Sequence, residues 1–340
     1  MRAFRLLEWG KPPELVDVPV PEPGPSEVLV RVGGVGACHS DLSIMNRSAG
    51  GPVPFTLGHE TAGWVAAVGP GAGRLAVGDP VLVYISWACG RCVRCRQGLD
   101  HWCVDRGPMA GMGADGGLAE YQLVPSERYL VPLDGLDPRT AGPLADAGLT
   151  AYHAVRRSSP VLVGPGHTVL VIGVGGLGHM AVQIARAITT ARIIAVDTDE
   201  RKLALARRLG ADAFLAGADA IEGVRELTKG EGASLVIDFV GTDATLAFAA
   251  ASARIFGHLT LVGAAMGTLP LTFASIPKEC SVAVTGMGSI PDLHEVVELA
   301  RAGLIGAEVE TFPLEQAPEV YRRLDRGEIV GRAVLNPATG

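Results

Sequence analysis

Short segments in which apolar and polar residues alternate are typical of about the first 150 residues of the chain. The clearest examples are residues 27–32, 63–68 and 80–84, and clusters of Pro and Gly such as 19–25 separate them. Alternation with a period of two predicts strands with one buried face, and the Pro and Gly clusters predict turns. The N-terminal part is therefore expected to be rich in β-strands.

From about residue 165 onward, continuous apolar runs alternate with segments of helical periodicity. Residues 168–173 are typical of a strand buried on both faces, and apolar residues then recur at intervals of three, four and seven across 177–188. Asp199 is the expected N-cap of a helix that stops at Gly210. The alternation continues through 192–197, 199–210, 224–230, 234–240, 244–253, 258–263 and 281–286. Such strand–helix repeats predict βαβ units and a parallel, doubly wound sheet.

A short helical pattern at 292–303 and a further tail follow the last of these strands. The doubly wound α/β unit is thus bracketed by two pieces of a second, β-rich part of the chain. The length of 340 residues agrees with this division, since domains usually contain ~100–200 residues.

The composition excludes several classes of protein. Hydrophobic residues make up 48% of the chain, which argues against global disorder. The formal net charge is −7 and there is no run of Lys or Arg, so nucleic acid is not an expected partner. No apolar run is long enough to cross a membrane, and the N-terminal segment lacks a signal-peptide pattern. A cytoplasmic protein is therefore expected.

Four of the six cysteines are closely spaced, in the order Cys89-x₂-Cys92-x₂-Cys95-x₇-Cys103. A disulfide-rich secreted domain would be shorter and would spread its cysteines along the chain. The residues between these cysteines are rich in Gly and Arg, which are poor core residues. Four thiolates at this spacing predict a closed tetrahedral zinc site that stabilises a small lobe, residues 89–103, with an iron–sulfur cluster as the alternative.

A glycine-rich segment with the pattern G-x-G-x-x-G joins the strand 168–173 to the helix that follows it. Its members are Gly173, Val174, Gly175, Gly176, Leu177 and Gly178. In this context the first glycine permits the tight turn, the second lets a pyrophosphate approach the backbone, and the third lets helix and strand pack closely. The segment therefore predicts a dinucleotide site; a purely structural turn is the alternative.

Asp197 lies nineteen residues after Gly178, at the end of the next expected strand. A carboxylate there accepts hydrogen bonds from both ribose hydroxyls of NAD and repels the 2′-phosphate of NADP. Arg201 and Lys202 lie close by and are able to bind a phosphate. NAD is therefore the predicted cofactor, and NADP remains an alternative.

Cys38 and His59 form a third pattern, because each has a carboxylate close by in the sequence, Asp41 and Glu60. A thiolate and an imidazole are good zinc ligands, whereas a lone Cys or His is more often a core residue. A catalytic zinc needs a third protein ligand and an open position. Spacing alone does not identify that third ligand.

The order of these patterns resembles the zinc-dependent alcohol dehydrogenases of the medium-chain family. The resemblance is carried by Cys38-x-Ser40-Asp41, Gly58-His59-Glu60-x₂-Gly63-x₅-Gly69, the four-cysteine lobe and the glycine turn. It covers essentially the whole chain and is greatest to bacterial NAD-dependent secondary alcohol dehydrogenases. It implies a GroES-like catalytic domain at 1–147, an inserted Rossmann domain at 148–286, and a return to the catalytic domain at 287–340.

The resemblance also implies roles for individual residues. Cys38 and His59 resemble two ligands of the catalytic zinc, and Asp146 stands where the family places its third ligand, which is often a cysteine. Glu60 resembles a residue behind the metal that coordinates it transiently. Asp41 resembles the carboxylate that orients the ring of His59.

Further residues resemble the proton path and the cofactor contacts of the family. Ser40 resembles the hydroxyl that takes the alcohol proton, and His39 and Arg332 resemble groups near the cofactor pyrophosphate. Ser43 and Met287 resemble pocket-lining positions, and neither is a bulky aromatic. Two zinc ions per chain and one NAD are therefore expected.

The implied activity is reversible hydride transfer between NAD and an alcohol, which yields a ketone or an aldehyde. Medium-sized or aryl-substituted secondary alcohols are the expected substrates, and a polyol dehydrogenase is the alternative within the same class. A zinc- and nucleotide-binding protein without turnover is the alternative from another class. The family is usually oligomeric, so a homo-oligomer is expected, with a tetramer favoured over a dimer.

Overall fold

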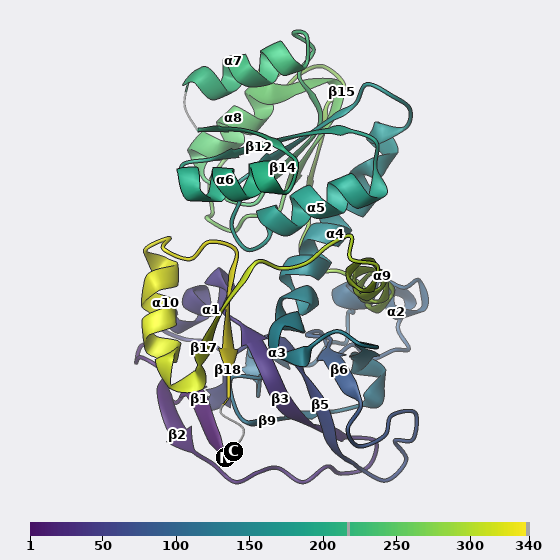
Figure 1. The fold of residues 1–340 in the computed structure, drawn as a ribbon, viewed down its shortest axis with the longest axis vertical. Helices are drawn as coiled ribbons and strands as arrows, with labels where there is room; N and C mark the ends of the chain where they lie inside the picture. Colours follow the sequence, from purple (N-terminus) through teal and green to yellow (C-terminus); the bar gives the residue numbers. More distant parts are fainter. Residues whose placement is uncertain (216–217, 338–340) are drawn as a thin grey trace. The chain divides into compact units, whose positions relative to one another are not determined.

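The computed structural model describes residues 1–215 and 218–337, and the chain divides into two compact units. Unit 1 comprises Met1–Leu149, Gly288–Ala302 and Ala307–Gly340, and unit 2 comprises Thr150–Met287 and Gly303–Gly306. The two units have separate sheets (Figure 1). Each unit also has its own cluster of buried apolar residues.

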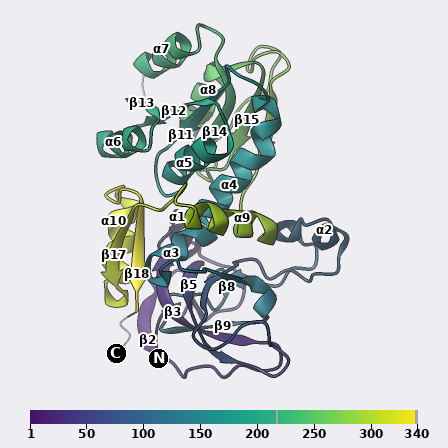
Figure 2. The same ribbon diagram turned by 45° about the vertical axis from the view of Figure 1, so that its right-hand side comes forward.

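The sheet of unit 2 is built from strands that pair in parallel with their neighbours. In spatial order they are β13 (Asp212–Leu215), β12 (Arg192–Asp197), β11 (Thr168–Ile172), β14 (Ala233–Asp238), β15 (Ala253–Leu261) and β16 (Ser281–Val284). Figure 2 shows β13 through β15 side by side in this order. The order is that of the doubly wound dinucleotide fold, whose ligand site lies where the strand order reverses. The predicted doubly wound sheet is therefore confirmed.

Helices alternate with these strands along the chain. They are α4 (Ala147–Ser158), α5 (Gly178–Ile188), α6 (Glu200–Arg208), α7 (Ala218–Leu227) and α8 (Asp243–Ser252). Helix α6 begins where the sequence predicts, because the Asp199 side chain accepts a hydrogen bond from Arg201 N, and Gly210 follows it with φ +89°. Strand β15 begins earlier than the predicted 258–263, and β13 was not predicted.

Unit 1 is rich in β-strands, as the alternating pattern predicts, and most of these strands pair antiparallel. One sheet has the order β10-β6-β5-β3-β18-β17, with β9 also paired to β3; another has the order β2-β1-β4; and β7 pairs with β8. The strands are β1 (Arg2–Leu6), β2 (Glu14–Asp17), β3 (Val28–Gly36), β4 (Phe55–Thr56), β5 (Glu60–Val68), β6 (Pro80–Val83), β7 (Met109–Ala110), β8 (Gly113–Ala114), β9 (Tyr121–Val124), β10 (Leu130–Pro132), β17 (Val309–Pro313) and β18 (Arg332–Asn336).

Short helices flank the sheets of unit 1. They are α1 (His39–Met45), α2 (Val93–Arg96), α3 (Pro138–Ala141), α9 (Ile290–Arg301) and α10 (Ala317–Asp325), with 3₁₀ turns η1 (Asp100–Trp102), η2 (Glu127–Tyr129), η3 (Gly142–Ala145) and η5 (Leu314–Gln316); a further turn, η4 (Ser159–Leu162), lies in unit 2. Helix α10 packs beside α1 (Figure 1). The C-terminal segment therefore contributes directly to the part of unit 1 that carries Cys38.

The end of β3 packs closely against neighbouring segments because glycine residues there have no side chain. A Cβ atom on Gly34 would lie 2.5 Å from the carbonyl oxygen of Arg139, so only a glycine fits there. Strand β18 pairs antiparallel with this end of β3, with Val334 opposite Gly36. Strand β18 is thus paired with the segment that leads into Cys38.

No helix in the described part of the chain is both long and apolar enough to cross a membrane.

Candidate functional site

Cys38, His59 and Asp146 meet in the interior of unit 1 and are called here the mixed-ligand group. Cys38 precedes α1, His59 precedes β5 and Asp146 follows η3. One ligand atom from each residue lies within 4.8 Å of the other two. Asp146 Oδ2 is 3.6 Å from Cys38 Sγ and 3.5 Å from His59 Nε2. The structure therefore brings together the three residues that the sequence predicts as catalytic zinc ligands.

The local fold at α1 fixes Cys38. Its backbone is extended (φ −119°, ψ 151°), and its side chain caps the helix by accepting a hydrogen bond from Ser40 N. In return, Asp41 Oδ2 accepts a hydrogen bond from Cys38 N at 3.0 Å. This reciprocal arrangement is a capping box, and it satisfies two N–H groups that a helix start leaves open.

The ring of His59 is in direct contact with Asp41, the residue predicted to orient it. Nδ1 lies 2.9 Å from Asp41 Oδ1, and both side chains are buried. In the neutral imidazole, a ring nitrogen that donates to a carboxylate leaves a lone pair on the other nitrogen, and a metal ion that takes the place of the second proton binds this lone pair. Nε2 is buried and has no hydrogen-bond partner among the described residues. This orphaned atom, facing a thiol and a carboxylate, fits a metal ion.

The electrostatics of the mixed-ligand group also suit a cation. Burial lowers the pKa of His59, but the charge of Asp41 and the proximity of Asp146 outweigh it, so the net pKa is raised well above its usual value. The pocket therefore has a surplus of negative charge that attracts a proton or a cation. A thiolate, an imidazole and a carboxylate are all accepted zinc ligands.

Glu60 is buried behind the mixed-ligand group and is held by Arg332. Arg332 donates from Nε to Glu60 Oε2 at 2.9 Å and from Nη2 to Oε1, while Ala147 N donates to Oε1 at 3.1 Å. A Cβ atom on Gly36 would lie 1.7 Å from Oε2, so this glycine makes room for the carboxylate. Arg332 Nη2 is also 3.5 Å from Asp146 Oδ2. Arg332 is buried in this network, and its expected contact with a cofactor pyrophosphate stays a prediction.

Ser40 and His39 occupy the first turn of α1. Ser40 is half-buried, and its Oγ lies 3.6 Å from Cys38 Sγ, at the edge of the mixed-ligand group. His39 is exposed, and its carbonyl oxygen accepts a hydrogen bond from Ser43 Oγ at 3.2 Å. The predicted proton acceptor thus lies beside the predicted ligands.

The four-cysteine lobe, residues 89–103, brings its thiols into one cluster. Cys92 Sγ is 3.5 Å from Cys95 Sγ and 3.8 Å from Cys103 Sγ. Sulfur atoms bound to one tetrahedral zinc at ~2.3 Å are about 3.8 Å apart, so the spacing fits that ion. Backbone N–H groups of Cys95 and Val104 lower the pKa of Cys92 to about 6, which favours the thiolate.

Backbone N–H groups also donate to two other thiols of the lobe, those of Cys89 and Cys103. Cys92 N donates to Cys89 Sγ at 3.4 Å, and the N–H groups of Cys89 and Asp105 donate to Cys103 Sγ at 3.3 and 3.4 Å. All six cysteines of the chain are free of disulfide bonds. The cluster is therefore built from one short segment and from its own backbone.

The glycine turn of unit 2 joins β11 to α5, as predicted. Gly173 adopts φ +84° and donates to Val196 O at 2.8 Å. A Cβ atom on Gly178 would lie 1.8 Å from Gly173 O, whereas one on Gly175 would meet nothing within 4 Å. The first and last glycines are thus required by the backbone, and the open space at Gly175 suits the approach of a ligand. Leu177 is the N-cap of α5 and Gly176 is half-buried.

Asp197 ends β12 and connects that strand to the glycine turn. Its Oδ2 accepts from Val174 N at 2.7 Å, and its Oδ1 accepts from Asp199 N at 3.0 Å. A carboxylate offers about four acceptor positions, so each oxygen retains capacity for a further donor. Arg201 forms an ion pair with Asp199, with Nη2 to Oδ2 at 2.6 Å, and Lys202 is half-buried.

The sequence gives no signal for one residue that touches this network. The hydroxyl of Tyr321, in α10, donates to Asp41 Oδ2 at 2.8 Å across a separation of 280 residues. Burial and the charge of Asp41 raise the pKa of Tyr321 well above its usual value, so its hydroxyl keeps its proton. No motif or spacing relates α10 to α1 in the sequence.

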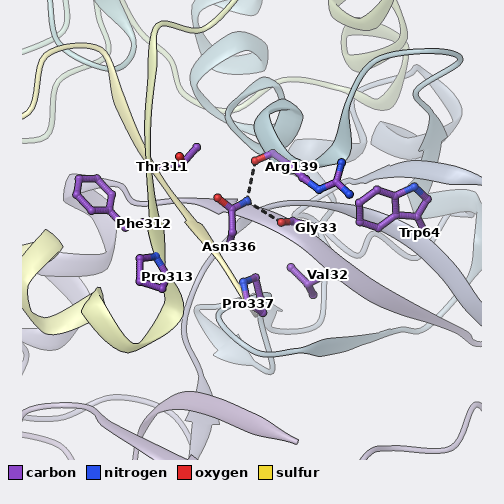
Figure 3. Close-up of a pocket in the computed structure, with 9 residues that line it drawn as sticks. All are labelled: Val32, Gly33, Trp64, Arg139, Thr311, Phe312, Pro313, Asn336 and Pro337. Atoms are coloured by element: carbon purple, nitrogen blue, oxygen red, sulfur yellow. Dashed lines mark hydrogen bonds between the residues drawn. The ribbon is translucent and has the colours of Figure 1, made fainter. Parts of the chain in front are cut away.

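A groove of about 400 Å³ lies elsewhere on unit 1 (Figure 3). At its centre, Asn336 Nδ2 donates to the carbonyl oxygens of Gly33 and Arg139 at 2.7 and 2.9 Å. Trp64 and Phe312 also line it. None of the predicted site residues is among its lining residues, so it is separate from the mixed-ligand group.

Comparison with known proteins identifies the family. Residues 24–135 match the alcohol dehydrogenase GroES-like domain, and residues 176–302 match the zinc-binding dehydrogenase domain. An NAD-dependent alcohol dehydrogenase of Sulfurisphaera tokodaii is 37% identical over 99% of this chain and 100% of the relative. A D-arabinose 1-dehydrogenase (NADP(+)) of Saccharolobus solfataricus is 34% identical over 99% of this chain and 97% of the relative.

A solved structure agrees with these relatives. The alcohol dehydrogenase of the archaeon Aeropyrum pernix superposes with a TM-score of 0.91 at 38% identity, covering 99% of this chain and 100% of the other. The chain belongs to the zinc-binding, medium-chain alcohol dehydrogenase family, and the predicted fold class, a Rossmann domain combined with a GroES-like domain, is confirmed.

Proposed function

We propose that this protein is a zinc-dependent alcohol dehydrogenase that uses NAD. The observation that carries the proposal is the mixed-ligand group, in which a buried imidazole nitrogen without a hydrogen-bond partner faces a thiol and a carboxylate. Three protein ligands leave a fourth position open for substrate, as in catalytic zinc sites. When bound, the zinc ion acts as a Lewis acid on the alcohol oxygen and the nicotinamide accepts the hydride.

The residues around the mixed-ligand group have supporting roles in this proposal. Asp41 keeps His59 in the tautomer whose Nε2 is a ligand. Arg332 neutralises the buried Glu60 and lies close to Asp146, so it keeps a second carboxylate from adding charge beside the ligands. Ser40 accepts the proton of the alcohol and passes it outward. Glu60 is proposed as an occasional ligand only when it leaves Arg332.

The proposed cofactor is NAD, and unit 2 is its site. Domain 148–286 binds the cofactor, and the segments 1–147 and 287–340 form the catalytic part. N–H groups at the start of α5 donate to the pyrophosphate, and Asp197 accepts hydrogen bonds from the ribose hydroxyls. The ion pair between Asp199 and Arg201 supports NAD over NADP, because it engages the arginine that a 2′-phosphate would need.

The proposed substrates are medium-sized or aryl-substituted secondary alcohols. Ser43 and Met287 are pocket-lining candidates by resemblance alone, and neither is a bulky aromatic residue. The runner-up is a polyol or sugar substrate, which the D-arabinose 1-dehydrogenase among the relatives favours.

A substrate panel with both cofactors tests the activity and the substrate class together. The formation of NADH is followed with ethanol, a 2-alkanol, 1-phenylethanol and D-arabinose. We expect kcat/KM to be highest for one of the secondary alcohols, with NAD preferred over NADP. A higher kcat/KM on ethanol would contradict the substrate class, and a higher value on D-arabinose would favour the sugar alternative. No turnover of any alcohol would overturn the activity.

We also propose a homo-oligomer in the cytoplasm, with a tetramer favoured over a dimer. Strand β16 lies at the edge of its sheet, and it exposes Val284, while Phe256 of β15 is also exposed. Such an edge tends to be covered by a partner. Light scattering coupled to size exclusion distinguishes a dimer from a tetramer, and a monomeric mass would contradict the proposed homo-oligomer.

The cytoplasm is proposed as the location because six free cysteines suit a reducing compartment.

A further inference from the structure

Tyr321 is the outermost member of a hydrogen-bonded chain that leads to the mixed-ligand group. Its hydroxyl donates a hydrogen bond to Oδ2 of Asp41, and Oδ1 of the same carboxylate pairs with His59 Nδ1. Oδ2 of Asp41 also accepts a hydrogen bond from Cys38 N. A single buried carboxylate therefore connects Tyr321 to two of the proposed zinc ligands, to one through its ring and to the other through its backbone.

The ring of Tyr321 is itself held in place. It stacks on Phe4 with a centroid distance of 6.2 Å and an interplanar angle of 11°. Tyr321 is 4% exposed and belongs to the hydrophobic core of unit 1, with Ile44 of α1 in the same cluster. A hydroxyl on a ring fixed in this way has a defined position, so its hydrogen bond is directional and not adaptable.

Asp41 depends on such donors because it is fully buried. A carboxylate without access to water must be satisfied by protein groups, and its oxygens receive donors from three directions, Cys38, His59 and Tyr321. The first two donors belong to the ligand residues themselves. Tyr321 is the donor that comes from a separate element, α10, and it therefore anchors the carboxylate to the rest of unit 1.

We propose that Tyr321 is a positioning residue for the metal centre. By fixing Asp41, it holds the ring of His59 and the backbone of Cys38 in the orientation in which their ligand atoms converge with Asp146. The inference rests on the proposed function, since it requires the mixed-ligand group to hold zinc. Partners that orient metal ligands typically change metal affinity about 10- to 100-fold when they are removed. Because Tyr321 acts one step further out, we expect the lower end of that range.

The rate of zinc release to a colorimetric chelator tests this role without reference to turnover. In Tyr321→Phe, the zinc of the mixed-ligand group should leave about tenfold faster, while the zinc of the four-cysteine lobe should leave at the wild-type rate. The matched control is Tyr84→Phe, because Tyr84 is also buried in unit 1 and its hydroxyl donates to Gly288 O at 2.8 Å. Tyr84→Phe also removes a buried tyrosine hydroxyl and should release the zinc of the mixed-ligand group as the wild type does; the lobe zinc is not the control readout, because Tyr84 also interacts with Asp100 of the lobe.

A double-mutant cycle with Asp41→Asn shows whether Tyr321 acts through Asp41. If it does, Tyr321→Phe should change the release rate by no more than about twofold once Asp41→Asn is present, because the two side chains form one unit. The visible spectrum of the cobalt-substituted protein should shift in Tyr321→Phe and stay unchanged in Tyr84→Phe. The expected outcome of the double-mutant cycle supports the proposal, and so does the expected change in the cobalt spectrum.

Other outcomes overturn it in distinguishable ways. If the wild type holds two zinc ions and Tyr321→Phe releases both at the wild-type rate, the positioning role alone is overturned. An equal effect of Tyr321→Phe with and without Asp41→Asn would show that the residue does not act through Asp41. A wild type that holds zinc only in the four-cysteine lobe would overturn the proposed function and the positioning role together.

Discussion

The four-cysteine lobe and the mixed-ligand group both suit zinc, but the chain builds them in opposite ways. The thiols of the lobe come from one segment, and their hydrogen-bond donors are backbone groups of residues 89–105. The mixed-ligand group joins residues as far as 108 positions apart and is surrounded by side chains from β18 and α10. A closed site can therefore be a local feature, whereas an open site depends on the fold of all of unit 1.

Cys95→Ala is expected to show the largest difference between the two sites, because it should affect the lobe alone. The lobe has little hydrophobic core of its own, so its order depends on the metal. The variant should lose one zinc per chain, and backbone hydrogen exchange across 89–103 should become more than tenfold faster. The mixed-ligand group should keep its ion. Exchange measured by mass spectrometry checks this result, and unchanged protection of the lobe would contradict a metal-dependent structure.

The surroundings of the mixed-ligand group should instead be sensitive to substitutions at residues far away in the sequence. Of these, Arg332→Met is expected to lower the free energy of unfolding most. The substitution leaves the buried carboxylate of Glu60 without its ion-pair partner, and breaking a buried pair typically costs about 3–5 kcal/mol. Urea denaturation should reveal this loss. The double variant Glu60→Gln, Arg332→Met should recover a large part of it. Equal destabilisation in the single and double variants would mean that the pair itself is not the cause.

Asp197→Ser tests the other locally built site, the glycine turn with its carboxylate. Removal of the charge should raise kcat/KM for NADP relative to NAD by about tenfold, since a 2′-phosphate is no longer repelled. Asp197→Asn is the matched control, because it keeps an acceptor for Val174 N. An unchanged ratio of the two cofactors in both variants would mean that Asp197 does not contact the ribose.

The smallest effect is expected at Asp199, the N-cap of α6. Asp199→Ala should lower the free energy of unfolding by about 1 kcal/mol, whereas Asp199→Asn should retain most of the cap. Arg201 lowers the pKa of Asp199 to about 2 in the folded protein. The charge-dependent part of the stabilisation is therefore present above about pH 4 and lost as the pH falls towards 2. Urea titrations at pH 7 and pH 3 measure the difference between the variants.

The same contrast explains how far the sequence predicts the structure. Strand β12 has its predicted bounds, and α6 begins at its predicted cap, because both follow from neighbouring residues. The thiol cluster likewise follows from spacing. By contrast, the contacts of Arg332 with Glu60 and of Tyr321 with Asp41 join residues 272 and 280 positions apart. No local pattern contains such pairings, since they arise only when β18 and α10 return to the first part of unit 1.

Asp146 was identified through resemblance and not through spacing, which makes it the residue on which the metal assignment depends most. Asp146→Ala should reduce the zinc content from two ions per chain to one and abolish turnover, with little change in the free energy of unfolding. Asp146→Cys should retain both ions, since a thiolate is an equally good ligand.

The most direct measurement is the zinc content of wild type and Asp146→Ala, determined by mass spectrometry under native conditions. We predict two ions in the wild type and one in the variant, with the remaining ion in the four-cysteine lobe. Two ions retained in Asp146→Ala would contradict the proposed ligand set and would direct attention to Glu60 as the third ligand.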